Sequence, residues 1–226
     1  MIVVVGRETD AGVQALLQRW RDSDAALLTP RDLSRAGWAH RPASPAEGRA
    51  VVAGRAVAVG EIRGVVAALE TLTTRDIAHI VRRDRPYVVA EMYAFLLAWL
   101  RTLPCRVLNR PTPQSLAGCG WQREQWVLVA DALGIPTVAV CEPTDGSDEH
   151  DTAITVTQVA DRTLDAPTDT VAAWVVRLAA AAQTSTLVAR FRDGSPPRFV
   201  SAGVVPDFSR PQVADGVLRW IEGASA

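Results

Sequence analysis

Arginine side chains beside predicted strands are the residues best suited to chemistry in this sequence. Arg7 and Arg110 each follow a short apolar segment that predicts a buried strand, and Arg63 alternates with Glu61 along a third. The planar guanidinium of arginine suits a carboxylate, because it can donate two parallel hydrogen bonds. We therefore expect these side chains to converge on a cleft that holds an acidic ligand. The alternative is a set of internal ion pairs that only fixes the packing, formed by Glu61, Arg63, Glu91 and Arg110.

The turn at residues 6–10 lies between the first predicted strand and the first predicted helix. In an open α/β sheet such a turn presents helix N-terminal amides to ligands, and Arg7 could pair with a carboxylate there. A second interpretation needs no ligand, because Thr9 or Asp10 can cap the helix through a side-chain oxygen. The sequence leaves both interpretations open.

Two of the seven tryptophans lie near predicted loops rather than on helix stripes. Because tryptophan is a common anchor of binding sites, Trp38 and Trp121 are candidates for a pocket wall or an interface. The full candidate ligand-binding set is Arg7, Trp38, Glu61, Arg63, Glu91, Arg110 and Trp121.

No metal site is predicted, and no catalytic residue can be named. Asp148, Glu149, His150 and Asp151 are adjacent in a polar segment, so they do not easily converge on one ion, and a hydrated acidic linker is the better interpretation. Cys119 lies between two glycines, where a helix start could acidify its thiol. No partner histidine for a cysteine nucleophile is evident in the sequence.

The composition excludes several classes of protein. All 24 basic residues are arginine, so the chain can form no Walker A loop, no protein-kinase lysine and no Schiff base. The three cysteines show no C-x-x-C spacing, which argues against a disulfide framework and favours a cytoplasmic protein. No basic run indicates nucleic-acid binding. The most apolar segment, residues 87–100, is shorter than the roughly 20 residues of a membrane span.

The order of apolar segments predicts an α/β fold in two parts. Residues 1–141 alternate short strands with helices, which predicts an open, mostly parallel sheet with flanking helices, and residues 103–140 read as a βαβ-like unit. The segment at 87–100 is apolar on all sides, so we expect an internal helix. The expected domains are completed by an acidic linker at 142–152 and a small α+β lobe at 153–226.

Three motifs occur in a suggestive order. Residues 60–65 read GEIRGV, residues 107–111 read VLNRP and residues 133–136 read LGIP, with the long apolar helix between the first two. In this order they resemble the N-terminal half of ATP-grasp ligases, near the peptide-modifying and ribosomal-protein-modifying branch. The resemblance covers residues 1–141, with a weaker likeness in the tail. It implies a pre-ATP-grasp-like front domain, which holds an acceptor substrate, followed by a nucleotide-binding core.

The groups that such ligases use for nucleotide and metal are missing from the sequence. The resemblance implies lysines on the phosphates and an acidic pair with an asparagine on magnesium, but Ser201 and Val204 stand where glutamate and asparagine are expected. Only residues 142–152 lie where the first nucleotide-binding lobe and its glycine-rich loop are expected. We therefore expect a truncated, degenerate core that uses no cofactor and no metal.

These observations predict a cytoplasmic pseudoenzyme that acts as a binding or accessory protein, in a biosynthetic pathway. Its expected partners are a small carboxylate molecule or a peptide, together with a full-length ATP-grasp enzyme or a second copy in a homodimer; neither nucleic acid nor membrane is expected. The alternative is an active ATP-dependent carboxylate–amine (peptide) ligase in which arginines replace the phosphate-binding lysines, because arginine can bind phosphate bidentately.

Overall fold

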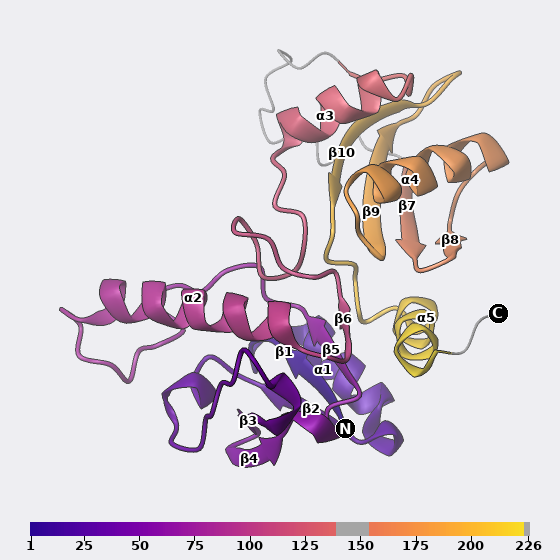
Figure 1. Cartoon of the computed structure of the whole chain (residues 1–226). Helices are drawn as coiled ribbons and strands as arrows, with labels where there is room; N and C mark the ends of the chain where they lie inside the picture. The colour runs from indigo at the N-terminus through magenta and orange to yellow at the C-terminus, as the bar shows by residue number, and fades with distance from the viewer. Residues whose placement is uncertain (139–153, 224–226) are drawn as a thin grey trace. The chain divides into compact units, whose positions relative to one another are not determined.

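The computed structural model describes residues 1–138 and 154–223. The chain divides into two compact units, one formed by Met1–Gly118 with the segment from Asp207 onward, the other by Cys119–Pro206 (Figure 1). This division differs from the expected one, because the last helix groups with the first unit and the helix before residue 133 groups with the second. The expected acidic linker at 142–152 lies outside the described residues.

The first unit is built on a parallel four-stranded sheet in the order β2-β1-β5-β6. Every residue of β1 and β5 is buried, which is the pattern of strands covered on both faces. The parallel sheet predicted for the first part of the chain is therefore confirmed. Its strands are β1 (Ile2–Val5), β2 (Ala25–Leu28), β5 (Gly64–Ala67) and β6 (Arg106–Leu108).

The described helices of this unit are α1 (Ala11–Arg19), α2 (Arg85–Thr102) and α5 (Pro211–Glu222). α5 lies so close to β5 that a Cβ added to Gly64 would come within 2.4 Å of Ile221 Cγ2. The absence of a side chain at Gly64 therefore lets the final helix pack against the sheet that begins the chain.

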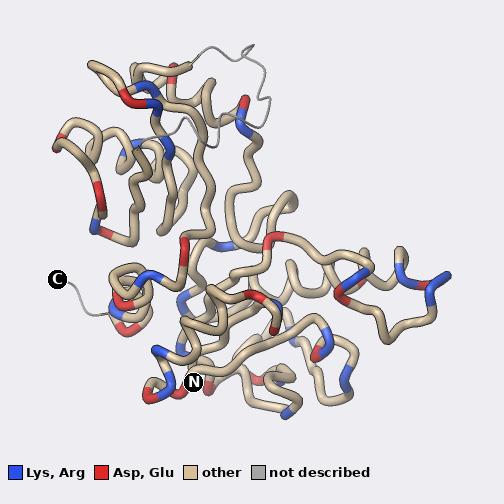
Figure 2. Tube along the Cα trace, turned by 180° about the vertical axis from the view of Figure 1, so that it is seen from behind, with Lys and Arg blue, Asp and Glu red and all other residues tan. Residues whose placement is uncertain are grey.

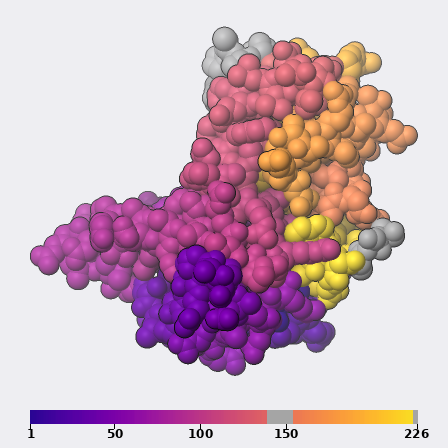
Figure 3. Space-filling model, in the orientation of Figure 1, coloured from indigo at the N-terminus to yellow at the C-terminus, as the bar shows by residue number. Residues whose placement is uncertain are grey.

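α2 is not the internal helix that its apolar composition predicts. Its buried residues are Leu96, Trp99 and Leu100, all in its second half, whereas Tyr87 near its start is 70% exposed. In Figure 1 the amino-terminal half of α2 extends past the parallel sheet, and Figure 3 shows the surface of this region. No helix among the described residues is both long enough and apolar enough to cross a lipid bilayer.

An antiparallel hairpin lies beside β2. It is formed by β3 (Arg49–Val52) and β4 (Arg55–Ala58), and its two turn residues, Ala53 and Gly54, have positive φ angles of 49° and 75°. The amide of Ala53 donates to the carbonyl of Leu27 at 3.0 Å, which holds this turn near the end of β2. The described 3₁₀ turns of the unit are η1 (Arg21–Ser23), η2 (Asp32–Ser34), η3 (Pro45–Glu47) and η4 (Val59–Glu61).

The second unit has an antiparallel four-stranded sheet in the order β10-β9-β7-β8. Helices α3 and α4 pack on it, and its core includes Phe191 and Phe199, whose rings meet edge to face at 5.6 Å. A small α+β lobe is thus present, as the tail predicts. Its elements are α3 (Arg123–Ala132), β7 (Ile154–Val159), β8 (Arg162–Leu164), α4 (Asp169–Ala181), β9 (Thr186–Arg192) and β10 (Arg198–Gly203).

The LGIP segment belongs to this second sheet. Gly134 ends α3 in a left-handed backbone conformation (φ 69°), and Val138 then donates a backbone hydrogen bond of 3.0 Å to Phe199. The βαβ-like interpretation of residues 103–140 is therefore wrong, because the strand before the helix joins the parallel sheet and the segment after it pairs with β10. The composition of an apolar segment does not indicate which sheet the segment will join.

Candidate functional site

A hollow of about 460 Å³ lies where β1 and β2 end. Open α/β sheets bind their ligands beyond the carboxyl ends of the strands, so this position is the expected one for a binding site. Its lining comprises Glu8, Leu27, Thr29, Arg31, Asp32, Arg35, Ala53 and Gly54.

Asp32 fixes the backbone around this hollow. Its side chain is 5% exposed, and one carboxylate oxygen accepts hydrogen bonds from the amide and the hydroxyl of Thr29, both at 2.9 Å. The other oxygen accepts from the amide of Gly54 at 2.9 Å. These bonds hold the end of β2 next to the β3–β4 turn, so the Asp32 carboxylate stabilises the local structure.

Arg35 brings a guanidinium with open donors to the hollow. Its Nε lies 3.6 Å from Asp32 Oδ1, which is an ion-pair distance but too long for a hydrogen bond. The guanidinium lies over Gly54, where an added Cβ would be 3.1 Å from Nη1. The side chain is half exposed and donates no hydrogen bond to any residue that the structure describes.

Arg31 and Glu8 add two exposed charges to the same lining. Within residues 1–138 and 154–223, neither side chain has a hydrogen-bond or ion-pair partner. A carboxylate ligand here would receive charge-assisted hydrogen bonds from Arg31 and Arg35. Glu8 would disfavour a ligand with further negative charge nearby, so the hollow suits a compact carboxylate.

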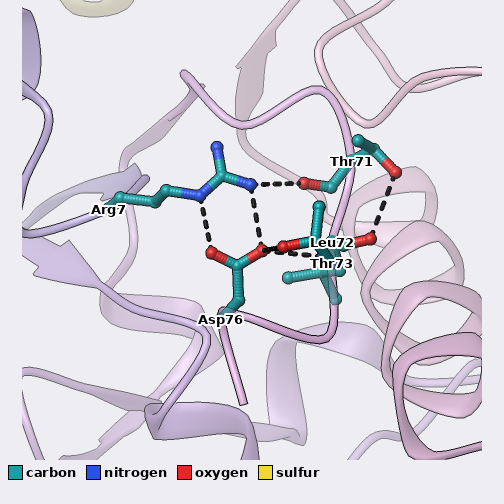
Figure 4. Close-up of polar contacts among 5 residues, drawn as sticks. All are labelled: Arg7, Thr71, Leu72, Thr73 and Asp76. Carbon is teal, nitrogen blue, oxygen red and sulfur yellow. Dashed lines mark hydrogen bonds and ion pairs between the residues drawn. The ribbon is translucent and has the colours of Figure 1, made fainter. Parts of the chain in front are cut away.

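Arg7 is held by a partner within the first unit. Its Nε and Nη2 donate to the two carboxylate oxygens of Asp76 at 2.6 and 3.0 Å, and Nη2 also donates to the carbonyl of Thr71 at 3.0 Å (Figure 4). The hydrogen bond to Asp76 raises the pKa of Arg7. Burial raises the pKa of Asp76, but hydrogen bonds from Arg7 and Thr73 outweigh it, so that pKa lies below its usual value.

The turn after β1 is also closed by its own residues. Asp10 Oδ1 accepts hydrogen bonds from the amides of Gly12 and Val13, at 2.9 and 3.1 Å, and so caps α1. This is the geometry of the second interpretation of the turn, in which a side chain rather than a ligand satisfies the helix amides.

Arg110 binds the carboxyl end of α2. Its two terminal nitrogens donate to four backbone carbonyls at 3.2–3.4 Å, those of Leu100, Arg101, Leu103 and Cys105. A cation at this end of a helix also complements the helix dipole. The contacts of Arg110 therefore stabilise the junction between α2 and β6.

Glu61 and Arg63 lie at the other end of the parallel sheet. β5 begins at Gly64, so both residues precede their strand, whereas Arg7 follows β1. Arg63 donates to the carbonyl of Ser23 and pairs with Glu222 at 3.4 Å. The expected convergence of Arg7, Arg63 and Arg110 on one cleft is therefore not found. Glu61 lines a separate hollow of about 380 Å³ at the amino end.

Trp38 belongs to an aromatic cluster beside α2. Its ring meets Phe95 at 5.0 Å and Trp99 at 5.5 Å, both edge to face, and its Nε1 donates to the carbonyl of Asp32 at 2.8 Å. Trp38 thereby supports the loop that carries Asp32, although it does not line the hollow.

The two remaining candidates lie apart from the hollow. Glu91 is exposed on α2. Trp121 belongs to the second unit, where its ring meets Trp126 at 4.8 Å. Neither residue lines the hollow at the ends of β1 and β2.

The described cysteines have no features of a nucleophile. Burial raises the pKa of the Cys105 thiol and of the Cys119 thiol. A raised pKa keeps a thiol protonated at neutral pH, whereas reactive cysteines need a lowered one. The geometry gives no support to the cysteine alternative.

The hollow's own charged residues were not among the candidates. Glu8 is separated from Arg31 and Arg35 by a predicted helix and strand, so their proximity is a product of the sheet order. One signal was available in the sequence. A Thr-Pro-Arg-Asp segment starting at Thr29 follows a predicted strand that is parallel to the first, and such strands end at the same edge.

The antiparallel sheet carries a different charge pattern. None of its four strands contains an aspartate or glutamate. Arg190 of β9 pairs in register with Ser201 of β10, and Arg192 with Arg198; the basic residues of the chain are the blue segments in Figure 2.

Across the described residues, no group of three or more His, Cys, Asp or Glu could hold a metal ion.

Comparisons with known proteins identify the fold. No family model and no curated protein matches the chain. Among solved structures, the macrocyclase MdnC from Microcystis aeruginosa MRC, bound with its precursor peptide MdnA, has a TM-score of 0.73 at 10% identity, over 98% of this chain and 99% of that chain. A RiPP-associated ATP-grasp ligase of Chryseobacterium gregarium, in complex with ADP, a leader and a core peptide, has a TM-score of 0.67 at 7% identity, over 100% and 97%. This chain has the fold of peptide-modifying ATP-grasp ligases.

A third structure with this ATP-grasp fold bears on the metal. The ATP-grasp ligase PsnB, complexed with a minimal precursor, Mg and ADP, has a TM-score of 0.66 at 13% identity, over 97% of both chains. In the present protein β10 offers Ser201, and Val204 beyond it is buried and has no oxygen in its side chain. Magnesium needs carboxylate or other oxygen ligands. The described strands of the antiparallel sheet therefore lack the carboxylates through which proteins usually hold magnesium.

Proposed function

We propose that this protein is a binding or accessory component of a peptide-modifying pathway, and that it holds a carboxylate-bearing small molecule or peptide rather than joining one to an amine. The observation that carries the proposal is the hollow beside β1 and β2, where Arg31 and Arg35 have no hydrogen-bond acceptor among the described residues. Exposed arginine forks of this kind are suited to a carboxylate.

The fold and the second sheet support the accessory role. The three similar structures hold a precursor or a leader and core peptide, which makes a peptide a natural ligand for a chain of the same fold. Strands without a carboxylate lack the side chain that usually holds magnesium, which is the common partner of a nucleotide's phosphates. Free Cys105 and Cys119 are consistent with a reduced, cytoplasmic environment.

Nuclear magnetic resonance of the full chain with two probes tests the ligand class. N-acetylglycine carries a carboxylate without an ammonium group, and glycinamide carries an ammonium group without a carboxylate. We expect N-acetylglycine to shift the amide signal of Gly54, with a Kd on the order of 1 mM for so small a probe, and glycinamide to leave it unchanged. Arg35→Ala should weaken binding about tenfold, while Arg82→Ala, which removes an exposed arginine that does not line the hollow, should not.

The same titration can contradict each half of the proposal. If N-acetylglycine shifts no amide around residues 53–54, the hollow is not the carboxylate site. If MgATP binds with micromolar affinity in a parallel calorimetric titration, the protein is not a binding component alone.

A second candidate is the active ATP-dependent carboxylate–amine ligase. Arg190, Arg192 and Arg198 on neighbouring strands favour it, because arginine can bind phosphate bidentately. Phosphate release from ATP in the presence of candidate acid and amine pairs tests it. Release above the background of a protein-free control would support the ligase, and no release across a broad panel would discard it.

A further inference from the structure

The strand β4 is hydrogen-bonded along one edge only. Arg49 of β3 lies opposite Ala58 of β4, but the amide and the carbonyl of Arg49 bond to Ala39, at 2.9 and 3.0 Å, on the far side from β4. Arg49 and Ala58 therefore form a non-hydrogen-bonded pair, in which the backbone groups of each residue point away from the other strand. Because this direction alternates along a strand, the amides and carbonyls of Ala56 and Ala58 both point outward from the hairpin.

These outward backbone groups are open. In the part of the chain that the structure describes, no hydrogen bond joins the backbone of Ala56 or Ala58 to a residue outside the hairpin. Proteins commonly block such an edge with a charged side chain, a proline or a bulge. The two outward positions of β4 are instead alanines in a regular ladder, so this edge can accept a further strand.

The hollow of about 380 Å³ at the amino end of the parallel sheet lies along this edge. Its lining comprises Arg55, Ala56 and Val57 of β4, together with Met1, Asp24 and Glu61. Successive side chains of a strand point to opposite faces. A hollow that contacts three consecutive residues therefore follows the edge of the strand and not one of its faces, and it gives an added strand room to lie against β4.

Opposite charges stand at the two ends of this hollow. Arg55 is the first residue of β4, and Glu61 follows the end of β4 by three residues. Both side chains are exposed, and neither has a hydrogen-bond or ion-pair partner within residues 1–138 and 154–223. Asp24 lies at the Glu61 end, because the amino group of Met1 contacts the Glu61 carbonyl at 2.8 Å and the Asp24 carboxylate at 3.3 Å.

We propose that β4 binds an extended peptide as an added antiparallel strand. The peptide backbone pairs with the outward groups of Ala56 and Ala58, which is a mode of recognition in which main-chain hydrogen bonds supply affinity and side chains supply specificity. In the antiparallel direction, which is slightly more stable than the parallel one, the peptide begins near Ala58 and ends near Arg55. A basic residue at its start then lies beside Glu61, and an acidic residue at its end lies beside Arg55.

This site is separate from the hollow that holds Arg31 and Arg35. The two hollows share no lining residue, although Gly54 lines one and Arg55 lines the other. The four residues of β4 span about 13 Å, so a segment of about five residues is enough to cover the edge. The inference goes beyond the function proposed for the first hollow and does not depend on it.

Amide hydrogen exchange of the full chain, read by nuclear magnetic resonance, tests the proposal. The probe is the blocked peptide N-acetyl-Arg-Thr-Val-Thr-Glu-amide, which has no terminal charge. It should bind with a Kd of roughly 0.1–1 mM. Exchange should slow at Ala56 and Ala58, whose amides are open, more than at Arg55 and Val57, whose amides already bond to β3. The reversed sequence has the same composition and should bind at least about tenfold more weakly.

Variants of the edge separate charge from backbone. Arg55→Glu should weaken the probe about tenfold, and a probe with lysine in place of its glutamate should recover the loss. The matched control is Arg82→Glu, which reverses an exposed arginine that lines neither hollow and should bind as the wild type does. Ala56→Pro removes an outward amide without removing a bond to β3, and it should also weaken the probe. Arg35→Ala, in the first hollow, should leave the affinity for this peptide unchanged.

Several outcomes overturn the proposal. They are a probe that does not bind, a probe that binds without slowing exchange at Ala56 and Ala58, and a reversed peptide of equal affinity. Protection of these two amides that rises with protein concentration in the absence of peptide would show that a second copy occupies the edge, and it also overturns the proposal. Each of these results leaves the N-acetylglycine titration of the first hollow unaffected, so the two proposals fail independently.

Discussion

In the parallel sheet the strands are apolar and the charges lie beyond their ends, whereas in the antiparallel sheet the charges lie on the strands. Arg106 is the one charged residue within the four parallel strands. The antiparallel strands carry Arg162, Arg190, Arg192 and Arg198. The difference follows from burial, because a parallel sheet covered on both faces leaves polar groups no place except its edges.

The carboxylates of the two regions differ in the same way. Beside the parallel sheet, Asp32 and Asp76 accept several hydrogen bonds each and hold the loops at the strand ends. The antiparallel strands have no carboxylate at all. Removing a carboxylate from the first region should therefore destabilise the fold, and adding one to the second should stabilise it.

Asp32→Ala should have the largest effect. The change leaves the amide and the hydroxyl of Thr29 without their acceptor in a buried place, and the amide of Gly54 without its acceptor in a partly buried one, which costs roughly 3 kcal/mol of unfolding free energy. Urea denaturation measures the loss. Asp22→Ala, at an exposed carboxylate, is the control and should change the stability by less than about 0.5 kcal/mol. Equal losses in the two variants would mean that Asp32 does not hold the strand ends.

Arg7→Met should have a smaller effect, and one that depends on pH. The Arg7 side chain is 38% exposed, so water screens its pair with Asp76 and the loss at pH 7 should be about 1 kcal/mol. The pKa of Asp76 lies below its usual value in the folded protein. Its contribution is therefore present above the unfolded pKa of about 3.9 and is lost as the pH falls through the lower, folded value.

Unfolding free energies of wild type and Arg7→Met, measured from pH 7 down to pH 3, give the test. The difference between the two proteins should be largest at pH 7 and should shrink below about pH 4, as Asp76 takes up its proton. Arg82→Ala is the control, since that arginine has no described partner and should show no such trend. A difference that stays constant over the whole range would show that Arg7 acts through packing.

Local patterns predicted much of the secondary structure. The apolar strands of the parallel sheet and the stop of α3 at Gly134 are each specified by a few neighbouring residues, and both are found. Partners distant in the sequence were not predictable. The acceptor of Arg7 is Asp76, 69 residues away, and nothing near either residue indicates their contact.

The hollow was missed for the same physical reason. The Arg35 guanidinium lies over Gly54, which belongs to the turn of a hairpin, and Glu8 reaches the site only because β1 lies next to β2. The sequence likewise indicated an internal α2. The apolar composition of a helix shows that the helix can be buried, but it does not show whether other segments of the chain pack on it. Long-range packing, which decides both questions, leaves no local signal.

Ser201→Glu should have the smallest effect and the opposite sign. Ser201 pairs in register with Arg190, whose side chain has no partner among the described residues, so a glutamate here adds a cross-strand ion pair worth up to about 0.5 kcal/mol. Ser201→Gln has the same length without the charge and is the control. Urea denaturation at low salt should separate the two variants, and 1 M salt, where the screening length is about 3 Å, should remove the difference. If the two variants are equally stable at low salt, a carboxylate at position 201 does not stabilise the protein through Arg190. The two sheets would then differ in composition but not in the stability that a carboxylate adds.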